Sequence, residues 1–202
     1  MGQTIDFSAA INRNNFYCRD IDITGSGNTP GYGYSFGLGI SDLRIDTLRM
    51  NMAFYLHFDN ISGAGYFENL NHYSGQTMTA AVKKSTLSIG IYPLNFSFFK
   101  RRLSFSLGGT VGFKIWSQTL GRESSWSSPP TGPWTTKVVD FSDADPNWLI
   151  TFGIASGLSY NFNLGERWTL APKYRFCLGL GLDFSRFKSM RHEFGVVLRR
   201  KI

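Results

Sequence analysis

Hydrophobic and polar residues alternate along much of this chain with the two-residue period of a β-strand. In the segment 101–116, "RRLSFSLGGTVGFKIW", Leu103 and Phe105 lie on one side of an extended chain, and Ser104 and Thr110 lie on the other. This run is much longer than the five or six residues of an ordinary soluble strand. The pattern therefore predicts a long strand whose two faces meet different surroundings.

The same alternation recurs along the chain and predicts eight strands. They cover residues 4–12, 31–41, 48–59, 83–93, 101–116, 148–162, 168–184 and 192–202. The connections after the second, fourth and sixth strands are short, and those after the first, third and fifth are long and polar. We expect long outer loops at about 13–30, 60–80 and 119–147. An even number of strands with short turns at one end and long loops at the other is typical of outer-membrane barrels.

A membrane explains the length of the strands and the difference between their faces. A strand needs roughly 9 to 11 residues to cross the hydrocarbon layer, with one apolar face toward lipid. The other face would line a narrow lumen, for which glycines such as Gly31, Gly33, Gly37 and Gly39 are suited. We therefore predict a single-domain, all-β, eight-stranded antiparallel up-and-down transmembrane barrel over residues 1–202. The alternative is a soluble eight-stranded ligand-binding barrel, whose apolar face would point inward.

The chain also resembles a known group of proteins. The hairpin "YPLNFSFFKRRLSFSLGG" (92–109), the eight alternating segments and the ending "HEFGVVLRRKI" are similar to the small eight-stranded outer-membrane β-barrel proteins, of the OmpX and OmpA transmembrane-domain kind. The resemblance implies the outer membrane of a Gram-negative-type bacterium, with both termini in the periplasm. It implies contact with the lipid bilayer and lipopolysaccharide, and with the barrel-assembly machinery, which would recognise Ile202 where phenylalanine is more usual.

Composition and charge narrow the possible partners. Aromatic residues make up 16 % of the chain and charged residues only 17 %, which argues against disorder. The net charge of +7 is not accompanied by a nucleic-acid-binding motif, so we expect no nucleic acid partner. The basic clusters 100–102 and 199–201 would instead meet anionic headgroups at the periplasmic end. No residue pattern calls for a metal or another cofactor.

The inward face of the predicted strands carries charges of both signs. Because an eight-stranded barrel is just wide enough for side chains to fill it, these charges are expected to form a paired plug without an open pore. The predicted lumen charge network consists of Arg49, His57, Asp59, Lys84, Lys114, Lys173, Arg175, Asp183, Glu193 and Arg199.

Catalysis is another function that such a barrel could have. His57 and Asp59 are two residues apart on one predicted strand, near the outer rim, and a histidine beside a carboxylate can act as a general base. The alternative is therefore a barrel enzyme acting on lipid A or peptides. The pair matches the acid–histidine sets of outer-membrane proteases only loosely, and the outward-facing His192 has no convincing serine partner. We expect no enzymatic activity.

The longest predicted loop is the main candidate for recognition. Trp126 and Trp134 flank "SSPPTGP" in its middle, and tryptophan is the residue type most often found as an interface anchor. The segment 137–141, "KVVDF", alternates enough to extend the strand at 148–162 as a hairpin above the membrane. These features favour a structural, accessory or surface-recognition component that binds through its extracellular loops, with another envelope protein as one candidate partner.

Overall fold

The computed structural model of the protein describes residues 3–18, 25–45, 50–70, 74–99, 102–127, 135–143, 150–179 and 187–202. The strands are β1 (Thr4–Cys18), β2 (Gly25–Ile45), β3 (Met50–Leu70), β4 (Ser74–Phe98), β5 (Leu103–Ser127), β6 (Thr135–Asp143), β7 (Ile150–Tyr160), β8 (Phe162–Asn163), β9 (Trp168–Gly179) and β10 (Phe187–Lys201). Among these residues there is no helix long and apolar enough to cross a membrane.

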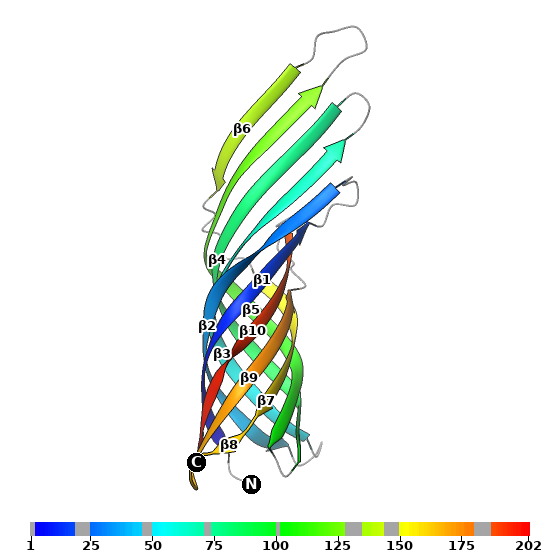
Figure 1. Cartoon of the computed structure of the whole chain (residues 1–202). Helices are drawn as coiled ribbons and strands as arrows, with labels where there is room; N and C mark the ends of the chain where they lie inside the picture. Colours follow the sequence, from blue (N-terminus) through cyan, green and yellow to red (C-terminus); the bar gives the residue numbers. More distant parts are fainter. Residues whose placement is uncertain are drawn as a thin grey trace.

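The long strands close into a barrel (Figure 1). Neighbours follow the order β1, β2, β3, β4, β5, β7, β9, β10, and β10 returns to pair with β1 from Thr4 opposite Lys201 to Cys18 opposite Phe187. Every pairing in the ring is antiparallel. Over the described residues the protein is an all-β, closed eight-stranded antiparallel barrel, which confirms the fold class predicted from the alternation. Both termini lie at the same end of it.

The two faces of the barrel wall carry opposite kinds of side chain. Phe7, Leu38, Leu56 and Ile89 form one cross-strand row on the outside, and all four are exposed. Polar side chains such as Asp6 point inward and are buried. This is the reverse of a soluble carrier, which would hide its apolar face inside the barrel. The structure therefore contradicts the soluble ligand-binding alternative.

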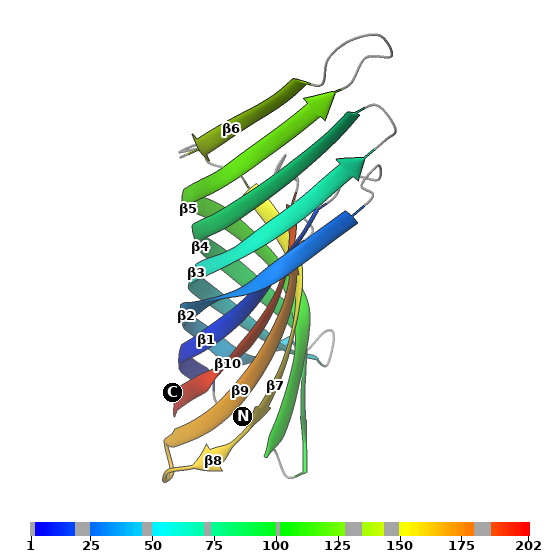
Figure 2. The ribbon, with the colours of Figure 1, turned by 45° about the horizontal axis from the view of Figure 1, so that its top comes forward.

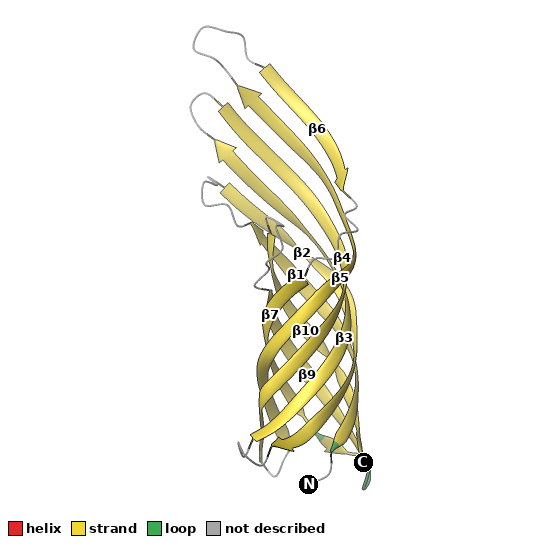
Figure 3. Ribbon diagram, turned by 180° about the vertical axis from the view of Figure 1, so that it is seen from behind, coloured by secondary structure: helices red, strands yellow, loops and turns green. Residues whose placement is uncertain are grey.

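The strands run further than the sequence pattern predicted, on one side of the barrel and at the end opposite the termini (Figures 1 and 3). β3 stays paired with β4 as far as Leu70 opposite Gly75, and β4 with β5 as far as Ser74 opposite Ser127. We call the part of β2 to β6 beyond the barrel the sheet extension; it comprises residues 25–30, 63–70, 74–82, 119–127 and 135–143.

The expectation of long loops at about 13–30, 60–80 and 119–147 is thus wrong for most of these residues. Residues 13–18, 25–30, 60–70, 74–80, 119–127 and 135–143 all lie in strands. Serine, threonine and glycine recur in these segments, and a backbone ladder forms between such residues without an apolar face to mark it. The predicted strand at 137–141 is confirmed, since β6 pairs with β5 as a hairpin (Figure 2).

A register shift marks the point where β5 leaves the barrel wall. Ser85 pairs with Trp116 but Thr86 pairs with Lys114, so β5 carries one extra residue there. Because side chains alternate along a strand, one extra residue exchanges its two faces. Lys114 below the shift is buried in the lumen, whereas Trp116 above it is exposed on the outside of the sheet.

The hairpin of β5 and β6 is tied by an ion pair whose strength should depend on pH. Arg122 donates from Nε to Oδ1 of Asp140 over 2.7 Å and from Nη2 to Oδ2 over 3.3 Å. These two hydrogen bonds hold the pKa of Asp140 below its usual value. Folding lowers the pKa of this carboxyl, so its ionised form stabilises the folded state at pH values above the pKa of the unfolded chain. That contribution is lost as the pH falls through the lowered pKa of the folded state.

We therefore expect amide protection in β6, corrected for intrinsic exchange, to fall slightly below about pH 4. The change should be small because the pair is exposed to solvent. Hydrogen exchange followed by NMR in micelles would measure this protection as a function of pH. The control is Asp140→Asn, which has no carboxyl to titrate and should show no such fall. Equal pH dependence in both proteins would contradict the assignment.

Candidate functional site in the lumen and the sheet extension

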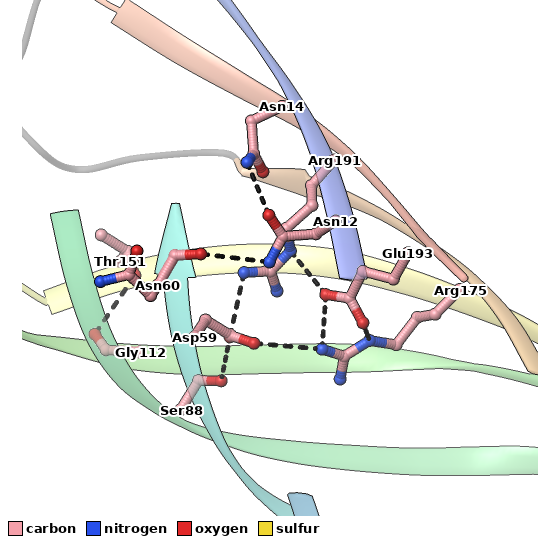
Figure 4. A network of polar contacts seen from close by, with 10 residues as sticks. All are labelled: Asn12, Asn14, Asp59, Asn60, Ser88, Gly112, Thr151, Arg175, Arg191 and Glu193. Atoms are coloured by element: carbon pink, nitrogen blue, oxygen red, sulfur yellow. Dashed lines mark hydrogen bonds and ion pairs between the residues drawn. The ribbon is translucent and has the colours of Figure 1, made fainter. Parts of the chain in front are cut away.

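The centre of the barrel holds two arginines that share two carboxylates (Figure 4). Arg175 on β9 lies directly opposite Glu193 on β10. Its Nε donates to Glu193 Oε2 over 2.6 Å and its Nη2 donates to Oε1 over 2.7 Å. The same Nη2 reaches Asp59 Oδ1 of β3 at 3.4 Å. Arg175 and Asp59 are 2 % and 1 % exposed, so this pairing occurs away from water.

Arg191 completes this group. Its Nη1 lies 3.0 Å from Asp59 Oδ2, and its Nε lies 2.7 Å from Glu193 Oε1 as an ion pair rather than an aligned hydrogen bond. Ser88 donates a further hydrogen bond to Asp59. Arg191 is absent from the predicted lumen network, because the last predicted strand begins at residue 192. The alternation that places Glu193 inward also places Arg191 inward, so a longer strand would have revealed it.

A second polar group lies nearer the termini and is centred on Asp6. Arg199 Nε lies 3.4 Å from Asp6 Oδ2, Ser41 donates to the same oxygen over 2.9 Å, and Tyr55 donates to it as well. Arg199 also donates from Nη1 to Asn161 Oδ1. Each carboxylate of the described lumen thus has an arginine partner, as buried charges require.

The remaining predicted lumen residues occupy varied positions. Lys114 is buried and Lys84 is half-buried. Lys173 Nζ lies 4.7 Å from the centroid of the Tyr55 ring. Arg49 and Asp183 lie outside the described residues.

His57 and Asp59 do not form the exposed rim pair on which a catalytic reading would depend. His57 is 2 % exposed and stacks on Tyr55, with ring centroids 5.4 Å apart. Asp59 is engaged by the two arginines instead. His192, on the outer face, shares a hydrogen bond with the Tyr174 hydroxyl. Over the described part of the chain there is also no group of three or more histidine, cysteine or acidic residues placed to hold a metal ion.

These contacts lead to a prediction about conductance. Because arginine and carboxylate side chains fill the middle of the lumen, ions should not pass through it at an appreciable rate. In planar bilayers we expect no steady single-channel current of the size that a porin carries. A stable porin-sized current from protein that has been shown to be folded would contradict a filled lumen.

The sheet extension carries the described part of the predicted recognition residues. Trp126 lies in β5, opposite Gly75 of β4 and Thr136 of β6, while Trp134 is outside the described residues. A groove with a volume of about 550 Å³ lies at the tip of these three strands. It is lined by Ser74, Gly75, Gln76, Ser125, Trp126, Ser127, Thr135 and Lys137.

The described residues form a closed eight-stranded antiparallel barrel, the architecture that the sequence resemblance implies. No protein-family model matches the chain, and no curated protein matches it.

Three solved structures follow a similar course. Ail of Yersinia pestis, in complex with the heparin analogue sucrose octasulfate, is 12 % identical with a TM-score of 0.44, over 98 % of this chain and 99 % of that one. Neisserial surface protein A is 14 % identical with a TM-score of 0.41, over 98 % and 97 %. The translocator domain of the autotransporter NalP from Neisseria meningitidis is 11 % identical with a TM-score of 0.35, over 98 % and 88 %. Likenesses this distant add no argument, and the fold class rests on the strand pairing.

Proposed function

We propose that this chain is a non-enzymatic barrel of the outer membrane of a Gram-negative-type bacterium, which acts as a surface-recognition or accessory component. The termini would lie in the periplasm and the sheet extension outside the cell. The observation that carries the proposal is the one-sided extension of β2 to β6 at the end opposite the termini. With the lumen occupied by paired side chains, the surface available to a partner is this extension.

The partner that the extension favours is a protein with an extended segment, such as another envelope protein. β6 is the last strand of the extension and pairs, within the described residues, with β5 alone. Its outer edge therefore presents backbone groups to which a further strand can be added. Val138 and Val139 are exposed beside that edge, one on each face, and supply apolar contact area.

The other proposed contacts lie at the opposite end of the barrel. Arg200 stacks over the Trp168 ring at 5.6 Å, and both side chains are exposed near the termini. A cation and an indole ring at this level suit anionic headgroups at a membrane interface. Lipopolysaccharide would surround the upper part of the barrel, and the barrel-assembly machinery would read the exposed Ile202 during insertion.

Site-specific crosslinking tests this function. A photoreactive residue at Thr136, on the outermost strand, should capture an envelope protein in intact cells. A reporter at Val139 should capture the same protein. Replacing residues 124–135 by a short Gly-Ser linker should abolish capture from Val139 while the barrel still folds, because the described residues of that segment lie in the sheet extension and not in the barrel wall. The matched control replaces residues 164–166 at the opposite end and should leave capture unchanged. Capture that survives the 124–135 replacement at full yield would overturn the proposal.

A further inference from the structure

A small cavity lies against the inner wall of the barrel, separate from the sheet extension. Gly195 of β10 lies opposite Ala10 of β1, and Ala10 lies opposite Ser35 of β2, so three adjacent strands present small residues in one row. Ser8 adds another small side chain on β1. The space that these residues leave admits the centre of a water-sized particle over about 10 Å³, which is about what one bound water-sized species needs.

The larger side chains around this cavity are mostly hydrogen-bond donors. His57, Lys173, Arg175 and Glu193 border it, and Arg175 donates to both oxygens of Glu193. Ser35 and His57 are only 3 % and 2 % exposed. Among the described residues, Ser35 Oγ and His57 Nε2 have no hydrogen-bond partner. Buried polar atoms of this kind normally bind something.

The charge around the cavity indicates the sign of the ligand. In the described lumen the carboxylates of Asp6, Asp59 and Glu193 each pair with arginine. Lys173 Nζ lies 4.7 Å from the centroid of the Tyr55 ring, and among the described residues no ion pair joins it to a carboxylate. The Lys173 side chain is half-buried. Withdrawing an ammonium group from water without a counter-charge is costly, and a small anion beside it would supply that charge.

We propose that this cavity binds a single halide ion, with chloride as the natural ligand. The Lys173 ammonium supplies the charge, and the Ser35 hydroxyl and the His57 Nε2–H donate hydrogen bonds. A halide is only slightly larger than a water molecule, so a small movement of the flexible lysine side chain accommodates it. Sulfate and phosphate are too large for the space. The site is independent of the proposed recognition function, because it uses no residue of the sheet extension.

Bromide shows the site directly. Protein refolded in sodium bromide and crystallised in the same salt should show an anomalous peak in contact with Lys173 Nζ and Ser35 Oγ. Density for water without an anomalous signal would overturn the proposal, and so would no density in the cavity.

A solution measurement keeps the test open if crystals do not form. At constant ionic strength, replacing gluconate by bromide should raise the urea midpoint of the folded protein in micelles. Ser35→Ala should require about tenfold more bromide for the same shift, since it loses a hydrogen bond to a charged ligand. Lys173→Met should lose the dependence, and Lys137→Met, on the exposed β6, should keep it. A urea midpoint that does not change with bromide concentration would contradict the site. So would a midpoint that depends equally on bromide in all variants.

Discussion

Replacing Arg175 by methionine is expected to lower the free energy of unfolding by about 3–5 kcal/mol, the usual cost of removing one partner from a buried ion pair. Arg175 makes two hydrogen bonds to Glu193 and a third contact to Asp59 in a site away from water. Without it, two buried carboxylates share the single guanidinium of Arg191. Urea unfolding in micelles, followed by circular dichroism, would measure the loss.

Two further variants show whether the loss comes from unpaired charge. Arg175→Met combined with Glu193→Leu should recover most of the stability, because Asp59 and Arg191 remain paired at 3.0 Å. Arg122→Met, which breaks an exposed pair in the sheet extension, should change the urea midpoint little. If Arg175→Met unfolds at the same urea concentration as Arg122→Met, the lumen network is not a source of stability.

Leu56→Arg is expected to destabilise the barrel by about 2–4 kcal/mol in lipid, as for a charged residue near the middle of a bilayer. Leu56 is 45 % exposed on β3 and lies between Leu38 and Ile89 on the outside of the wall. In lipid, the arginine would have to leave the hydrocarbon or draw water into it. The difference in unfolding free energy between variant and parent in vesicles would measure the cost.

The matched control is Val138→Arg on β6. Val138 is 56 % exposed, so it is at least as accessible as Leu56, but it lies in the sheet extension. Its replacement should have little effect, because the side chain there meets water. Equal costs at the two positions would mean that the exposed apolar band of the barrel does not face lipid.

The barrel itself was predictable because its signal is physical and repeated. A lipid-facing residue such as Phe7 must be apolar, and its neighbours Asp6 and Ser8 face a lumen that tolerates polar groups. The same constraint acts on every strand of the wall, so its period of two survives in the sequence. Closure then follows, since an open sheet edge cannot be satisfied in lipid.

The sheet extension was not predictable by the same reasoning. In the sheet extension both faces carry polar side chains, since Thr77 lies opposite Ser124 on one face and Gln76 opposite Ser125 on the other. Neither face there needs to be apolar. The extra residue of β5 next to Trp116 also exchanges the faces of that strand, which interrupts the period. Segments rich in serine and glycine are typical of loops. The sequence pattern therefore does not distinguish a polar strand of the sheet extension from a loop.

The lumen was predictable in composition but not in its contacts. Alternation assigns Asp59, Arg175 and Glu193 to the inside of the barrel, but it does not say which of them meet. Asp59 and Arg175 are 116 positions apart in the sequence. Their contact in space depends on barrel closure and strand register. Arg191 was not predicted for a simpler reason, because the last strand was expected to begin at residue 192 and β10 begins at Phe187.

The central claim is that the exposed apolar band of this barrel spans a lipid bilayer, and flotation with vesicles tests it most directly. Protein refolded into phospholipid vesicles should float with the lipid in a density gradient, remain with it after an alkaline carbonate wash, and show β-type circular dichroism. A folded, monodisperse protein in buffer without detergent, which stays at the bottom of the gradient when vesicles are added, would contradict the account.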